Sequence, residues 1–131
     1  MIVLDASSLI AYLDPRDVHH EAVTAALSRL VRETWTVSAL NVAEVMVKAA
    51  HDDELLAELS ESIADLEPTV VAIEWHDAEP LAQIRARTRL KMPDCCVLRV
   101  AQSGGGRVLT TDDALRERAR DLGIEIVDLH A

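Results

Sequence analysis

Aromatic residues are scarce in this sequence, and their scarcity restricts the kind of core that it can form. Among 131 residues there are no phenylalanines, one tyrosine and two tryptophans, although half of the residues are hydrophobic. A folded chain of this length buries roughly two-thirds of the surface that it exposes when unfolded, so we expect a mainly aliphatic core. The hydrophobic content excludes a disordered chain, and the length fits one domain over residues 1–131.

Cysteines and long apolar runs are also scarce. The two cysteines, Cys95 and Cys96, are neighbours in the sequence and cannot form a disulfide framework, which favours a reducing compartment. No run approaches the ~20 apolar residues of a membrane-spanning helix. The N-terminal stretch MIVLDASS lacks the basic segment of a signal peptide. We therefore expect a cytoplasmic protein without a membrane segment.

Basic residues are in the minority, because 13 Lys and Arg face 23 Asp and Glu, for a formal net charge of −10. This average argues against a nonspecific nucleic-acid binder, which needs cations to replace counterions. The charges are unevenly distributed: residues 52–79 hold ten acids and no Lys or Arg, whereas residues 85–107 hold six basic residues and one acid. Five of these basic residues are candidate phosphate contacts, with a solvated helix end as the alternative: Arg85, Arg87, Arg89, Lys91 and Arg99.

Short β-rich runs alternate with longer helical segments along the chain. Strands are expected at residues 1–5, 34–39, 70–73, 107–111 and 124–129. Helices are expected at residues 7–13, 17–33, 41–50, 53–66, 77–90, 94–104 and 113–122. We expect Asn41 to cap one of these helices. Apolar strands that alternate with helices predict an α/β fold, in which a parallel sheet of about five strands is covered on both faces.

Four acidic residues fall where the strands end or the helices begin. They are Asp5, Glu44, Asp94 and Asp112. In open parallel sheets, ligands bind beyond the carboxyl ends of the strands, so these four carboxylates can converge on one rim. Packed carboxylates repel one another unless a cation neutralises them, and oxygen ligands favour hard ions such as Mg²⁺ or Mn²⁺.

Each acid also has a structural alternative. Asp5, Asp94 and Asp112 could serve as helix N-caps. Glu44 lies in an apolar stretch, where a carboxylate is costly unless it is paired or bound to metal. The alternative for Glu44 is an exposed ion pair with Lys48, four residues further along the same helix.

The ordered set of motifs resembles the PIN-domain family, and in particular the single-domain VapC-type toxins of bacterial toxin–antitoxin pairs. The motifs are, in chain order, VLDASSLIAYL, VSALNVAEVM, MPDCCVLRVA and VLTTDDAL. They supply Asp5 with Ser7, then Glu44, then Asp94, and last Thr110 with Asp112. The resemblance covers the whole chain and implies a three-layer α/β/α PIN fold. The T-x-D register favours Asp112 over its neighbour Asp113 as the fourth acid.

The resemblance implies a Mg²⁺-dependent endoribonuclease that cleaves RNA with a metal-activated water and so inhibits translation. A metal held by Asp5, Asp94 and Asp112 would bind a phosphate oxygen and lower the pKa of a bound water. Glu44 would hold the ion through a water or orient the nucleophile. Ser7 and Thr110 would donate hydrogen bonds that fix the orientation of the carboxylates.

The resemblance also implies protein partners, namely a VapB-type antitoxin and a second copy of the chain in a homodimer. We expect such an interface on the apolar helices within 17–33 and 40–66. Two other functions are alternatives for a small acidic α/β chain. A phosphoacceptor receiver domain is disfavoured, because Asp5 is a single acid and neither Lys48 nor Lys91 ends a strand. A catalytically silent PIN-like domain that binds RNA or protein stays open as the alternative.

Overall fold

The computed structural model describes residues 1–130 and contains four strands, seven α-helices and two short 3-10 helices in that range. In chain order these elements are β1 (Ile2–Leu4), α1 (Ala6–Leu13), α2 (His20–Arg29), β2 (Trp35–Ser38), α3 (Ala39–Met46), η1 (Val47–Ala49), α4 (Asp53–Asp65), β3 (Thr69–Val71), η2 (Trp75–Asp77), α5 (Ala78–Thr88), α6 (Met92–Gly104), β4 (Arg107–Leu109) and α7 (Asp113–Asp121). Their alternation follows the expected α/β pattern.

The strands form one parallel sheet in the order β3-β2-β1-β4. The fifth strand expected at 124–129 is reduced to a single parallel bridge between Val108 and Ile126. Two backbone hydrogen bonds make this bridge, one from Val108 to Glu125 and one from Val127 to Val108. This segment divides its side chains between the two sides of the sheet, because Ile124 packs in one core and Val127 in the other.

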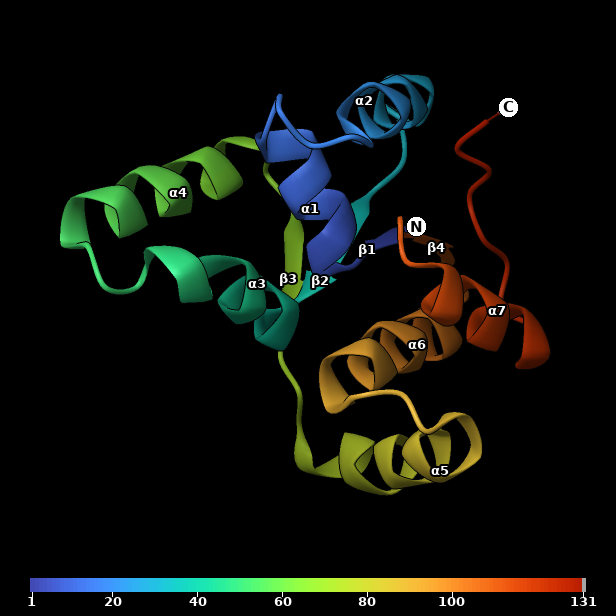
Figure 1. Ribbon diagram of the computed structural model, residues 1–131. Helices are drawn as coiled ribbons and strands as arrows, with labels where there is room; N and C mark the ends of the chain where they lie inside the picture. Colours follow the sequence, from blue (N-terminus) through green and yellow to red (C-terminus); the bar gives the residue numbers. More distant parts are fainter. Residues whose placement is uncertain (131) are drawn as a thin grey trace.

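The side chains of β1 point alternately to the two faces of the sheet, and this alternation explains why helices cover both faces and form three layers with it (Figure 1). Ile2 and Leu4 pack in one core cluster with residues of α1, α2, α3 and α4. Val3 points the opposite way, into a second cluster with residues of α5, α6 and α7. Successive strand side chains face opposite sides of a sheet, so a fully apolar strand needs helices on both faces. The predicted α/β/α architecture with a largely aliphatic core is confirmed.

Capping determines where the two helices nearest the strand ends begin. The expected cap at Asn41 is wrong, because Ser38 caps α3 through a hydrogen bond from the Asn41 backbone N–H. Asn41 is instead a buried residue of the first turn. Helix α6 begins at Met92, so Pro93 lies within its first turn. The helix ends at Gly105, whose φ of 68° is a left-handed cap.

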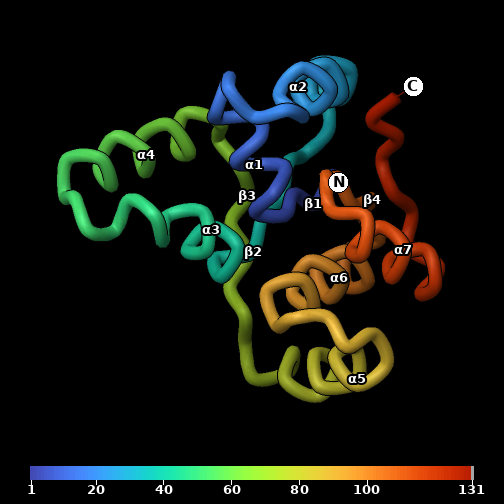
Figure 2. The backbone as a smooth tube through the Cα atoms, in the orientation of Figure 1, coloured from blue at the N-terminus to red at the C-terminus, as the bar shows by residue number. Residues whose placement is uncertain are grey.

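Edge strand β3 leads through an extended segment to η2 and α5, which Figure 2 shows on the opposite side of the sheet from α4. Cys95 and Cys96 are buried and unpaired in α6, as expected for core residues. Within the described part of the chain, none of the helices is both long and apolar enough to cross a membrane.

Candidate active site

All four predicted acids lie at the same edge of the sheet, beyond the carboxyl ends of the strands. Asp5 directly follows β1, and Asp112 follows β4 and caps α7. Asp94 lies in the first turn of α6, and Glu44 lies in α3, the helix that follows β2. The charges of Asp112, Asp5 and Glu44 all act on the Asp94 carboxyl. The fold therefore brings the four carboxylates into one electrostatic neighbourhood.

Asp5 is the most enclosed acid, with an exposed fraction of 3%. The Ser7 hydroxyl lies 2.8 Å from both carboxylate oxygens, the Ser8 backbone N–H donates at 2.9 Å, and the Thr110 hydroxyl donates at 2.6 Å. Burial raises the pKa of Asp5, and these hydrogen bonds partly oppose that rise. Asp5 therefore caps α1 and also holds a fixed carboxylate at the rim.

Ser7 and Thr110 link the end of β1 to the end of β4. The Ser7 hydroxyl accepts a hydrogen bond from the Thr111 backbone at 3.1 Å, and the Thr110 hydroxyl accepts one from the Asp112 backbone at 3.0 Å. The two hydroxyls lie 3.2 Å apart. Both hydroxyls therefore lie against the Asp5 carboxylate.

The doublet of Asp112 and Asp113 separates into two environments. Asp112 is half-buried and accepts a hydrogen bond from the Leu115 backbone at 3.1 Å. Asp113 has a side chain that is 90% exposed and pairs with Arg116 at 2.5 Å. Arg116 also donates to the Thr110 carbonyl at 3.0 Å, which braces the turn between β4 and α7. This geometry favours Asp112 as the acid of the rim.

Asp94 has an exposed fraction of 8%, and no donor among residues 1–130 is hydrogen-bonded to its carboxylate. Burial raises its pKa to about 6, with further increases from the charges of Asp112, Asp5 and Glu44, while Lys91 acts in the opposite direction. A carboxyl with this pKa carries a buried charge at neutral pH without full compensation. A bound cation would relieve that cost.

Glu44 pairs with a lysine from a different element than the sequence suggested. Its Oε1 lies 3.1 Å from Nζ of Lys91, which precedes α6, and no ion pair with Lys48 forms. Its Oε2 is buried and has no hydrogen-bond partner within residues 1–130. The hydrogen bond to Glu44 and the charges of Asp94 and Asp112 raise the pKa of Lys91, against the opposing effect of burial.

The donor set fits a hard divalent cation in chemistry, because every candidate ligand is a carboxylate oxygen. Within residues 1–130, however, no three Asp, Glu, His or Cys side chains are close enough together to hold a metal ion as they stand. The carboxylates are turned to other partners: Asp5 to hydroxyls, Asp112 to a helix N–H and Glu44 to Lys91. The unpartnered Oε2 of Glu44 is the atom most clearly in need of a ligand.

The five candidate basic residues do not share one environment. Arg85 donates to the carbonyl oxygens of Arg89 and Leu90 and so fixes the turn after α5. Arg87 lines a shallow surface hollow between α5 and α6, and Arg89 occupies a left-handed turn position with φ of 60°. Of the five, Lys91 is the one whose charge acts on Asp94.

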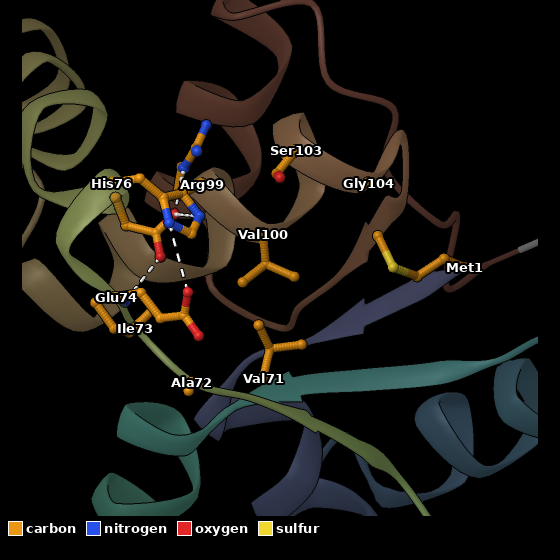
Figure 3. Close-up of a pocket in the computed structure, with 11 residues that line it drawn as sticks. Met1, Val71, Ala72, Ile73, Glu74, His76, Arg99, Val100, Ser103 and Gly104 are labelled. Atoms are coloured by element: carbon orange, nitrogen blue, oxygen red, sulfur yellow. Dashed lines mark hydrogen bonds and ion pairs between the residues drawn. The ribbon is translucent and has the colours of Figure 1, made fainter.

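Arg99 lies in a separate hollow, of about 280 Å³, beside the edge strand β3. Its Nε donates to Asp77 at 2.8 Å, and His76 lies 3.5 Å from Glu74 and 3.6 Å from Asp77. Figure 3 shows Glu74, His76 and Arg99 together at one side of this hollow. Arg99 is thus engaged in an ion pair that joins η2 to α6.

The tertiary contacts of two further residues, Asn41 and Arg116, were not predicted from the sequence. The buried Asn41 side chain donates to the Pro93 carbonyl at 3.1 Å and accepts from the Ser38 hydroxyl, so it ties α3 to the turn that carries Asp94. Arg116 braces the Thr110 turn. The available signal for Asn41 was a polar residue inside the mainly apolar stretch VSALNVAEV.

Comparison with known proteins identifies the family. The profile of the PIN domain matches residues 2–121, and this chain therefore belongs to the PIN-domain family. The predicted resemblance is confirmed at this level. A search of curated protein sequences found no match.

Solved structures share the fold over most of the chain. FitAcB from Neisseria gonorrhoeae aligns with a TM-score of 0.71 at 24% identity, over 99% of each chain. The VapC20 toxin from Mycobacterium tuberculosis, described as cleaving the sarcin–ricin loop, aligns with a TM-score of 0.70 at 12% identity, over 89% of this chain and 94% of its own. A toxin–antitoxin complex from Klebsiella pneumoniae aligns with a TM-score of 0.67 at 22% identity, over 86% of this chain and 87% of the matched chain.

Proposed function

We propose that this PIN domain is a Mg²⁺-dependent endoribonuclease, and that it acts in the cytoplasm as the toxin of a VapBC-type toxin–antitoxin pair. The observation that carries the proposal is the convergence of Asp5, Glu44, Asp94 and Asp112 from four different elements on one rim. Such a cluster repels itself without a cation, so a purely structural role would not account for all four.

The residues that would hold the ion are Asp5, Asp94 and Asp112, with Glu44 acting through a water. When bound, Mg²⁺ or Mn²⁺ supplies positive charge to a phosphate oxygen and lowers the pKa of a water molecule. Ser7 and Thr110 keep the Asp5 carboxylate in one orientation through their hydrogen bonds. Asn41 keeps the first turn of α6, and with it Asp94, against α3.

A largely apolar groove supports the proposal of an antitoxin partner. It lies between α1, α3 and α4, has a volume of about 650 Å³, and is lined by Ile10, Leu13, Val45, Leu55 and Leu59, with the charged residues Asp14, Arg16 and Lys48 also in its lining. Leu55 is half exposed, and Ile10 is more than one-third exposed. A groove of this kind suits an amphipathic helix or an extended apolar segment. The groove includes Val45, Leu55 and Leu59, which lie in the segment 40–66 where we expected an interface. The homodimer is proposed from the family resemblance alone.

Cleavage of RNA by the purified, antitoxin-free protein tests the proposed activity. Total RNA is incubated with Mg²⁺, with Mn²⁺ and with a chelator, and the products are analysed on denaturing gels. We expect metal-dependent cleavage that is lost in Asp5→Ala and Asp94→Asn. Asp113→Asn is the matched control, because it removes a neighbouring carboxylate that is exposed and paired outward with Arg116.

Two outcomes would contradict the proposal. A folded Asp94→Asn variant with wild-type cleavage would overturn the assignment of the site. A folded wild-type protein that cleaves no RNA with either metal would favour the alternative, a catalytically silent PIN-like domain that binds RNA or protein.

A further inference from the structure

We propose that Lys91 is a built-in counter-ion of the acidic site, which neutralises Glu44 while no metal is bound and contacts the substrate phosphate once a metal replaces it. This inference rests on the proposed function, since it assigns a regulatory and substrate-positioning role within the same site. It begins from one contact, the 3.1 Å ion pair between Lys91 Nζ and Glu44 Oε1.

The backbone of Lys91 is held firmly at the entrance of α6. Its carbonyl accepts hydrogen bonds from the backbone N–H groups of Asp94 and Cys95, both at 3.1 Å. The preceding carbonyl of Leu90 accepts hydrogen bonds from the Arg85 guanidinium and the Cys95 thiol. The lysine therefore starts from a fixed position, three residues before Asp94.

The side chain of Lys91, by contrast, is accessible to solvent. It is 61% exposed, and the Glu44 side chain that it contacts is 28% exposed. Ion pairs between a solvent-accessible lysine and a carboxylate are weak and easily exchanged. A divalent cation held by several carboxylates interacts far more strongly with them than one ammonium does. The ion pair can therefore offset the charge of Glu44 without blocking a metal.

Lys91 also lies where a second cation is useful after the metal arrives. The charges of Asp94 and Asp112, as well as that of Glu44, act on the Lys91 ammonium, so it lies near three of the four acids. A phosphate bound at this cluster would meet the ammonium on a flexible four-carbon stem, which suits a point-charge contact to a phosphate oxygen. Two of the other candidate cations are engaged elsewhere, Arg85 with backbone carbonyls of the turn after α5 and Arg99 with Asp77.

The test compares Lys91→Met with the wild type and with Lys48→Met. Lys48 is a matched control, because it is an exposed lysine four residues from Glu44 that forms no ion pair with it. Mn²⁺ alone is titrated into each metal-free protein by calorimetry. We expect Lys91→Met to bind Mn²⁺ three- to tenfold more tightly than the wild type, because the competing positive charge is gone. Lys48→Met should stay within twofold.

The second measurement follows binding of a fluorescent single-stranded RNA in the presence of Ca²⁺ over a range of salt concentrations. We expect Lys91→Met to bind RNA several-fold more weakly, with a salt dependence lower by about one phosphate contact. Lys91→Arg should restore RNA binding, because it restores the charge.

The two arms distinguish a failure of this inference from a failure of the proposed function. Unchanged or weaker Mn²⁺ binding by Lys91→Met would overturn the counter-ion role, whatever the protein does to RNA. Tighter Mn²⁺ binding with unchanged RNA binding would overturn the phosphate contact. If the wild type binds and cleaves no RNA, the proposed function fails together with the phosphate contact, and the Mn²⁺ titration still decides the counter-ion role.

Discussion

Replacing Asp94 by asparagine should make the metal-free protein more stable while it removes metal binding. The Asp94 carboxylate is 8% exposed, and no donor within residues 1–130 is hydrogen-bonded to it, so asparagine breaks no contact. Its charge is destabilising in the folded state, because burial and the neighbouring acids disfavour it. Asparagine has nearly the same shape and carries no charge.

The size of the effect follows from the pKa of Asp94. The pKa rises from 3.8 to about 6 on folding. Each pKa unit corresponds to roughly 1.4 kcal/mol, so the ionised carboxylate lowers the free energy of unfolding by about 2–3 kcal/mol at neutral pH. Asp94→Asn should recover this free energy of unfolding and so raise the melting temperature of a domain of this length by on the order of 5–10 °C.

The pH dependence provides a stricter test than the magnitude. A carboxyl with a raised pKa binds its proton more tightly in the folded state than in the unfolded state. Its destabilising effect is therefore absent below about pH 4, grows between pH 4 and pH 6, and is complete above pH 6. The stability gained by Asp94→Asn should follow the same course.

Urea denaturation of metal-free wild type and Asp94→Asn at pH 4.5, 6 and 7.5 measures this difference directly. Asp113→Asn is the control, and we expect little change because that carboxylate is exposed. Adding Mn²⁺ at pH 7.5 should stabilise the wild type and leave Asp94→Asn almost unaffected. Equal or lower stability of Asp94→Asn at pH 7.5, or a gain that does not depend on pH, would refute the reasoning.

Three further predictions concern the contacts around this acid. Thr110→Val removes the 2.6 Å hydrogen bond to buried Asp5 and should lower the free energy of unfolding by ~1–3 kcal/mol, as measured with urea. Asn41→Ala breaks the link to the Pro93 carbonyl and should weaken Mn²⁺ binding in calorimetry, whereas a purely local role would leave the affinity unchanged. Mn²⁺ affinity of the wild type should fall about tenfold per pH unit below pH 6, because the metal must displace the Asp94 proton; a flat profile from pH 5 to pH 7 would contradict this.

Local sequence patterns located Asp5, Asp94 and Asp112 because each of these acids lies beside a strand end or a helix start that the neighbouring residues predict. The apolar run before Asp5 predicted a buried strand, and the proline beside Asp94 predicted the start of a helix. Parallel pairing then places the strand ends at one edge. The α/β/α fold and the rim of acids both follow from this reasoning.

The partners of those acids could not be derived in the same way, because they come from distant parts of the chain. The hydroxyl of Thr110 reaches Asp5 across 105 residues, and the ammonium of Lys91 reaches Glu44 across 47. Helical periodicity suggested Lys48 for Glu44, since residues four apart are neighbours on a helix. The packing of α3 against the start of α6 places Lys91, rather than Lys48, beside Glu44.

The same packing changes the meaning of the overall charge of −10. The whole-chain average argued against a nucleic-acid partner, yet four of the 23 acids lie at a rim where a bound cation would offset them. Ten others fall in residues 52–79, which form α4 and the segments around β3. On the proposed function, the metal and Lys91 would set the charge that a phosphate meets, so a strongly acidic protein could still present a cationic site to RNA. Weak nonspecific binding combined with local recognition is the behaviour that this distribution predicts.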